Sequence, residues 1–267
     1  MAVEVTDERI AAAAARLHDG GWWFTPRQLY YAVCADVETA PVKVASAEVG
    51  LGLVLILVGI IIANRAVLVA LGGLGIVLVA VGAVTHLQER RPPPLGRLLA
   101  ISFADFEARL LAGGNQHPGL IDTSQPPAAG GGDAALVVVC DRAETAAILV
   151  ANRERLGDAR VVTGDDEPAL AGERRVVAVH DCDPAGCAVA ANLRDRGIEV
   201  TDAGINPREL AGKRVQQIEG APARLPRDLS GHLTVVELDW LRGGRRLELA
   251  TQTPEQLVVR VRAAMTA

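Results

Sequence analysis

The sequence predicts an α/β fold with a mostly parallel sheet, preceded by a small helical domain that a two-helix transmembrane hairpin interrupts. Three observations support this prediction. Three short helix patterns lie within residues 1–122, a long apolar stretch separates the second from the third, and strand and helix patterns alternate from residue 134 onward. Apolar strands that alternate with helices are typical of a parallel sheet covered on both faces.

The first and third helices are predicted from their end residues. Residues 6–21 read TDERIAAAAARLHDGG, which places Thr6 as the N-cap of a helix that two glycines end. Residues 102–112 read SFADFEARLLA and predict another helix from Ser102. Together with the helix between them, these segments suit a helix-turn-helix or winged-helix unit.

The second helix is predicted from the stretch FTPRQLYYAVC, residues 24–34. Thr25 and Gln28 match a capping box, and Pro26 occupies the first helical position. Tyr30 and Tyr31 therefore fall in the early turns of this helix.

A long apolar stretch accounts for the hydrophobic content of the chain, which is 50% with a mean hydropathy of +0.24. It runs from Val49 to Thr85 and is broken only by Asn64 and Arg65. The segment from Ala66 to Thr85 is by itself about as long as the ~20 residues that cross a bilayer. We expect a transmembrane hairpin; the alternative is a helical hairpin buried in a soluble core.

Basic residues beside this stretch predict its orientation. Lys43 precedes the hairpin, and Arg90 and Arg91 follow it, against Arg65 alone at the turn. The positive-inside tendency then places both ends of a two-pass protein in the cytoplasm.

The α/β half follows from the order of its segments. Apolar segments predict strands, and the segments between and after them predict helices. The strands are ALVVVC (135–140), ARVVTG (159–164), RRVVAVH (174–180), IEVTDAG (198–204) and HLTVVELDW (232–240); the helices are 143–156, 186–197 and 254–265.

Acidic residues follow two of these strands. Asp181 and Asp183 come after one of them, and Asp141 directly follows another. Ligands of such sheets bind at the carboxyl ends of the strands. Three carboxylates at one edge would repel each other unless a cation holds them, and oxygen ligands suit Mg²⁺.

Helix capping is the alternative role for these acids. Asp183 before Pro184 is a good N-cap, and Asp141 with Glu144 matches a capping box. Asp181 has no such alternative.

Two stretches carry a resemblance to a known family. VVAVHDCDPAG, residues 176–186, resembles the D-x-D-P-x-G segment of the Toprim domain of topoisomerase VI A subunits, to which the meiotic double-strand-break transesterases are related. RVVTG and VVELDWL resemble further Toprim segments. TPRQLYY, residues 25–31, resembles the stretch of the same family's winged-helix domain that bears the DNA-attacking tyrosine.

The resemblance implies a division of the chain and a set of partners. It predicts a winged-helix-like DNA-binding domain (1–43 and 87–122) and a Toprim-like α/β domain (134–267). The apolar stretch adds a transmembrane hairpin (44–86), which is foreign to the family, and a segment rich in proline, alanine and glycine adds a linker (123–133). DNA, a second copy of the chain and a separate ATPase subunit are the partners that the resemblance implies, besides the bilayer.

The resemblance also implies a chemistry. Tyr31 would attack a DNA phosphodiester, Arg27 would hold the phosphate, and the acids would position Mg²⁺. The family's first Toprim acid is a glutamate, so either Asp141 or Glu144 would have to replace it.

The sequence leaves three classes of function open. The first is a membrane-anchored enzyme of the topoisomerase VI A type that cleaves DNA or passes strands, with Tyr31 and Mg²⁺ as its chemistry. The second is a membrane scaffold without catalysis that binds nucleic acid or a partner protein, and the third is a magnesium-dependent nuclease that forms no covalent intermediate.

Overall fold

The structure is a computed structural model of the 267-residue chain. It falls into two compact units: Met1–Val37, Pro94–Lys213 and Gln217–Ala267 form the first, and Glu38–Pro93 with Arg214–Gln216 form the second. The residues it describes are 4–38, 54, 74–81, 94–99, 101–113, 117–123, 136–164, 170, 175–210 and 215–267.

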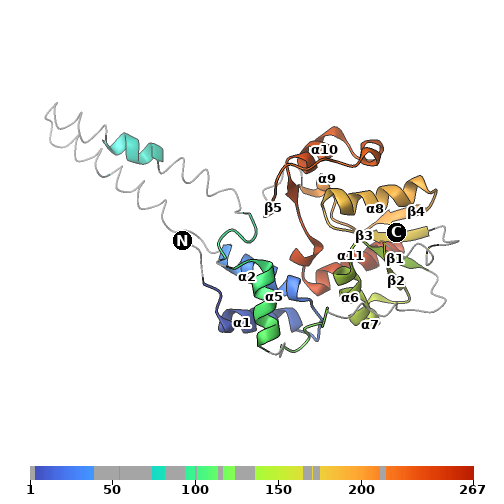
Figure 1. Cartoon of the computed structure of the whole chain (residues 1–267), viewed down its shortest axis with the longest axis horizontal. Coiled ribbons are helices and arrows are strands. Elements are labelled where there is room, and N and C mark those ends of the chain that lie inside the picture. Colours follow the sequence, from blue (N-terminus) through green and yellow to red (C-terminus); the bar gives the residue numbers. More distant parts are fainter. Residues whose placement is uncertain are drawn as a thin grey trace. The chain divides into compact units, whose positions relative to one another are not determined.

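A four-stranded parallel sheet forms the centre of the first unit (Figure 1). Its strand order is β2-β1-β3-β4, with each neighbouring pair parallel. The strands are β1 (Val137–Cys140), β2 (Arg160–Thr163), β3 (Arg175–Val179) and β4 (Glu199–Asp202). The predicted mixed α/β fold with a parallel sheet is therefore confirmed.

Helices cover both faces of this sheet, as Figure 1 shows. On one face, Ala190 and Leu193 of α8 (Pro184–Asp195) pack with alternate residues of β1 and β3. On the other face lie α6 (Ala143–Ala151) and α11 (Pro254–Thr266). Since both faces are covered, β1 is fully buried along its length, which explains its continuous apolar sequence.

The three N-terminal helices share a second apolar core. They are α1 (Asp7–His18), α2 (Pro26–Glu38) and α5 (Phe103–Ala112). Phe24 and Phe106 are fully buried in this core. The predicted caps are present: Thr6 accepts from the amide of Arg9, and Thr25 and Gln28 bond reciprocally. The assignment of these helices to a winged-helix domain, and the predicted domain boundaries, stay predictions.

The segment HLTVVELDW is a helix, so the predicted last strand was wrong. Helix α10 (Val235–Arg242) begins at a complete capping box in which Thr234 and Glu237 bond reciprocally. The cap satisfies backbone donors at the helix start and outweighs the strand preference of the adjacent valines. The remaining short elements are α7 (Arg153–Leu156), α9 (Pro207–Leu210), β5 (Ile218–Glu219), β6 (Arg245–Arg246), η2 (Arg227–Gly231) and η3 (Leu249–Thr251).

The predicted membrane localisation is corrected. Among the described residues, no helix is both long and apolar enough to cross a bilayer. Most of the predicted hairpin, 44–86, lies outside the described residues. The two-pass topology with cytoplasmic ends is therefore not retained.

A buried histidine joins the ends of β3 and β4. The Nδ1 atom of His180 lies 2.8 Å from the backbone oxygen of Asp181, and its Nε2 atom lies 3.1 Å from Oδ1 of Asp202. Arg194 approaches the other oxygen of Asp202 at 3.3 Å. Burial alone would lower the pKa of His180, but the hydrogen bond and the charge of Asp202 raise it above its usual value.

The free energy of unfolding should therefore fall as pH rises above about 6.5, the usual histidine pKa, and through the higher pKa of folded His180. The stabilisation that comes from protonated His180 is complete at lower pH, because His180 binds its proton more tightly in the folded state than in the unfolded state. Urea unfolding from pH 5.5 to 8.5 with a chelator would show this slope. Asp202→Asn should reduce this slope without removing it, because Asp181, whose pKa is raised to about 7, titrates in the same range. An equal slope in both proteins would contradict the prediction.

Candidate magnesium and tyrosine site

The acids after β1 and β3 meet at one edge of the sheet. The amide of Asp181 donates to Oδ2 of Asp141 at 2.8 Å. The parallel register places these residues together, because Cys140 pairs with Val179 at the strand ends. Gly186 allows this approach: a Cβ atom there would lie 2.5 Å from the Asp181 carbonyl oxygen and 2.9 Å from Asp141 Oδ2.

Arg142 neutralises part of this edge. Its Nε atom lies 2.6 Å from Oδ2 of Asp181, whose side chain is only 1% exposed. Its Nη2 atom lies 3.6 Å from Oδ2 of Asp183. The structure therefore brings Asp141, Asp181 and Asp183 into one cluster with Arg142.

Both buried carboxyl groups are costly to ionise. Burial and the charge of Asp141 raise the pKa of Asp181 to about 7, although Arg142 acts in the opposite direction. Burial also raises the pKa of Asp141. Such shifts mark carboxylates that a bound cation would stabilise in their ionised form.

The alternative role of these acids as helix caps is present at α8 and absent at α6. Asp183 is the N-cap of α8 and accepts from the amide of Gly186 at 2.7 Å. The N-cap of α6 is Arg142, without a side-chain bond, so Asp141 and Glu144 form no capping box. Glu144 turns instead toward α2.

Glu144 forms an ion pair with Arg27 of α2. The Nε atom of Arg27 donates to Oε2 of Glu144 at 2.9 Å, and its Nη1 atom donates to Oε2 of Glu248 at 3.1 Å. Its guanidinium also lies over the ring of Phe103, 4.1 Å from the centroid. These contacts fix the positively charged guanidinium of Arg27 beside the acids.

Tyr31 lies in the same network. Its hydroxyl group interacts with the charged side chains of Glu248 and Arg27, which pair with each other at 3.1 Å. Burial, followed by the charge of Glu248, raises the pKa of Tyr31 well above its usual value. Tyr30 is different, because its ring packs edge-on against Phe103 and Phe106 in the N-terminal core.

Glu248 was missed by sequence reasoning. It lies between β6 and η3, in a stretch without helix or strand periodicity, so no pattern indicated it. The backbone on both sides is fixed by the acidic segment: Leu247 pairs with Cys182, and the amide of Leu249 donates to Oδ1 of Asp181 at 2.7 Å. Glu248 is 8% exposed and lies where the tyrosine and the acids meet.

The donor atoms fit Mg²⁺ bound by few protein ligands. Within the described residues, Oδ1 of Asp141 and Oδ2 of Asp181 are buried and accept no hydrogen bond, although Oδ2 of Asp181 lies in an ion pair with Arg142. No group of three or more His, Cys, Asp or Glu side chains in that part of the chain is placed to hold a metal ion. Mg²⁺ is commonly held by one or two carboxylates with waters and substrate phosphates, so Oδ1 of Asp141 and the Arg142-paired Oδ2 of Asp181 are suitable oxygen ligands.

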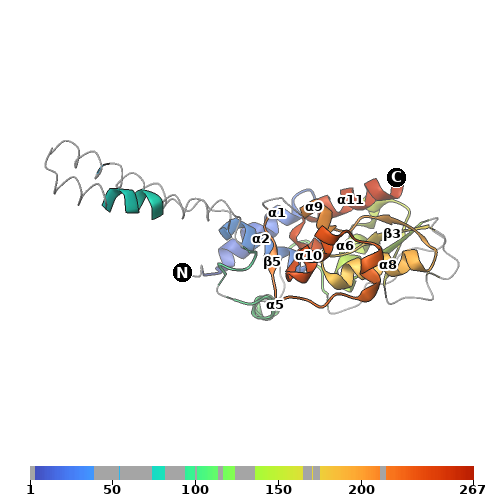
Figure 2. The same cartoon turned by 90° about the horizontal axis from the view of Figure 1, so that it is seen from above.

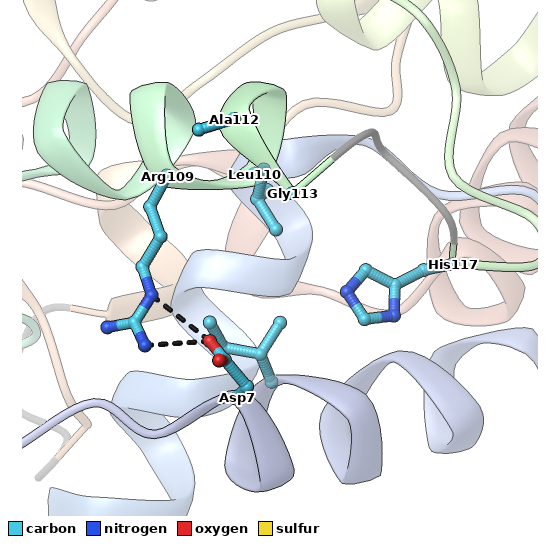
Figure 3. Close-up of a pocket in the computed structure, with 7 residues that line it drawn as sticks. Asp7, Arg109, Leu110, Ala112, Gly113 and His117 are labelled. Carbon is cyan, nitrogen blue, oxygen red and sulfur yellow. Dashed lines mark hydrogen bonds and ion pairs between the residues drawn. The ribbon is translucent and has the colours of Figure 1, made fainter.

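A hollow of about 470 Å³ lies apart from the site residues (Figure 3). It is lined by residues of α1, α5 and the segment after α5. Arg109 crosses it to Asp7, with Nη2 2.7 Å from Oδ1, while His117 lies on the opposite side. None of the predicted site residues lines this hollow.

Comparisons of the chain with protein-family models, curated proteins and solved structures found no match. The resemblance to the topoisomerase VI A subunit therefore rests on the quoted residues alone. The function has to be argued from the site.

Proposed function

We propose that this protein is a magnesium-dependent DNA transesterase in which Tyr31 attacks a phosphodiester. The supporting observation is the single network that joins Tyr31 and Arg27 of α2 to the acids at the end of the sheet. Residues more than 100 positions apart meet there through Glu248. The two stretches that resemble one family thus contribute to one site.

The net negative charge of the network favours the binding of a divalent cation, and a DNA phosphate can bind only when such a cation is present. Five carboxylates, of Asp141, Glu144, Asp181, Asp183 and Glu248, face two guanidinium groups, of Arg27 and Arg142. With every group ionised, the formal charge is −3. A DNA phosphate would be repelled by this excess unless a divalent cation offset it.

Each residue then has a role in the proposed reaction. Asp141 and Asp181 would hold Mg²⁺, which stabilises the charge that develops on the phosphate oxygens. Arg27 would donate to the same phosphate, because its guanidinium is fixed beside Tyr31. A second copy of the chain and an ATPase subunit belong to this proposal as partners.

Covalent capture tests the proposal. The purified protein is incubated with end-labelled duplex DNA and Mg²⁺, denatured, and separated by mass. Label at the mass of the protein, absent with a chelator, is the expected result. Cleavage without labelled protein would overturn the transesterase and favour the nuclease.

A scaffold without catalysis is the second candidate, and Arg142 is the observation that favours it. Its guanidinium already pairs with Asp181 and Asp183, so the chain supplies an internal counter-charge. In that case DNA binding without cleavage or labelled protein is expected, and gel shifts should be unchanged by the chelator.

A further inference from the structure

We infer that Glu248 is the general base that accepts the Tyr31 proton during attack. The inference rests on the proposed function, because it assigns a residue to that reaction. Tyrosine needs such a base, since its usual pKa of about 10 leaves it protonated near neutral pH.

The contacts of the Tyr31 hydroxyl identify the base. Glu248 and Arg27 are the charged side chains that act on it. Arg27 lies one helical turn before Tyr31, and its Nη1 atom donates to Oε2 of Glu248 at 3.1 Å, which places the Glu248 carboxylate beside this face of α2. Arginine cannot accept a proton, because it stays charged at all relevant pH values. The carboxylate of Glu248 is therefore the group near the reacting oxygen that can accept its proton.

The other acids have different partners. Asp181 accepts from Leu249 with Oδ1 and meets Arg142 with Oδ2. Glu144 meets Arg27 through its Nε atom, whereas Glu248 meets the same guanidinium through Nη1. Glu144 and Glu248 therefore share one partner and differ in their contact with Tyr31.

The position of Glu248 is held by the acidic edge. Leu247 and Cys182 exchange backbone hydrogen bonds of 2.8 and 3.1 Å, and Leu249 is anchored to Asp181. The backbone at Glu248 therefore cannot move without disturbing the residues proposed to bind Mg²⁺. A base placed in this way stays aligned with the tyrosine during the reaction.

The reaction balances with this assignment. The Tyr31 oxygen forms a bond to phosphorus while the bond from phosphorus to one sugar oxygen breaks. The tyrosine proton passes to Glu248, and the leaving sugar oxygen, on the opposite side of phosphorus, takes a proton from water; Glu248 then returns its proton to the solvent. The number of phosphodiester bonds is unchanged, so no oxidant or further reactant is required.

Tyrosine NMR tests the contact without using activity. The chain has two tyrosines, so [¹³Cζ]tyrosine gives two signals, and Tyr30→Phe assigns them. In the full-length Tyr30→Phe protein, Glu248→Gln should move the Tyr31 signal toward the position of an ordinary neutral tyrosine, because a charged acceptor is lost. Glu144→Gln, which also removes a carboxylate from Arg27, should leave that signal in place.

Covalent capture then tests the catalytic role. Glu248→Gln should slow adduct formation at pH 7.5 by about 100-fold or more, the range of general-base catalysis. The deficit should shrink as pH rises, because hydroxide replaces the missing base, whereas Glu144→Gln should keep the wild-type pH profile. A Tyr31 signal that Glu248→Gln does not move, or a deficit independent of pH, would overturn the inference.

The two proposals fail in different ways. If the wild-type protein forms no adduct, both the transesterase proposal and the general-base inference are rejected, even if the NMR experiment detects the contact. If the Glu248→Gln protein still forms the adduct at the wild-type rate, only the general-base inference is rejected. Circular dichroism and urea unfolding of each variant show whether a loss reflects an unfolded protein.

Discussion

Tyr31→Phe should reduce covalent capture of DNA to background. The substitution removes the oxygen proposed to form the phosphotyrosyl bond, and no other group of the site can make that bond. The ring stays, so the core contacts of α2 are kept. We expect a loss in the free energy of unfolding of about 1 kcal/mol, the usual contribution of one hydrogen bond.

Tyr30→Phe is the matched control. It also removes one hydroxyl group, from the adjacent residue of the same helix. That hydroxyl donates to the carbonyl oxygen of Ile101 at 3.5 Å, within the N-terminal core. Capture of labelled DNA should persist in this variant. Equal capture by the Tyr31→Phe protein would exclude Tyr31 as the nucleophile.

The double substitution Asp181→Asn and Asp183→Asn should weaken Mg²⁺ binding at least tenfold, or about 1.4 kcal/mol. Two negative charges are removed, while asparagine at 183 can still cap α8. The amide oxygen at 181 can still accept from Leu249. Isothermal calorimetry on the purified protein measures the change directly, and the DNA reaction should be lost with it.

An exposed acid provides the control for this measurement. Asp239 pairs with Arg242 on the surface of α10, and both side chains are more than half exposed. Asp239→Asn changes the net charge without touching the edge of the sheet, so Mg²⁺ affinity should stay within twofold of wild type. Unaltered binding in the double variant would instead place the metal elsewhere.

Local patterns predicted much of the fold correctly. The strands β1 to β4 and the helices α1, α2, α5, α8 and α11 were expected because apolar periodicity and capping residues act over a few positions. The same locality explains the error at α10. Adjacent valines favour a strand, whereas the capping box at Thr234 favours the helix that forms.

The site could be predicted only in part, because sequence patterns report on residues that are neighbours in the chain. Asp141 and Asp181 were placed together because the carboxyl ends of parallel strands meet at one edge. Glu248 could not be placed, because it follows the two-residue strand β6 and reaches the site through a bridge between Leu247 and Cys182.

The sequence by itself determined the α/β order, the acidic strand ends and the position of Tyr31 in an early helical turn. These properties depend on residues that are neighbours in the chain. Only the tertiary structure decided that Tyr31 and Arg27 meet Glu248, that Glu144 turns to Arg27, and that Arg142 pairs with Asp181. Such contacts join segments more than 100 residues apart or depend on side-chain direction, and no local pattern encodes either.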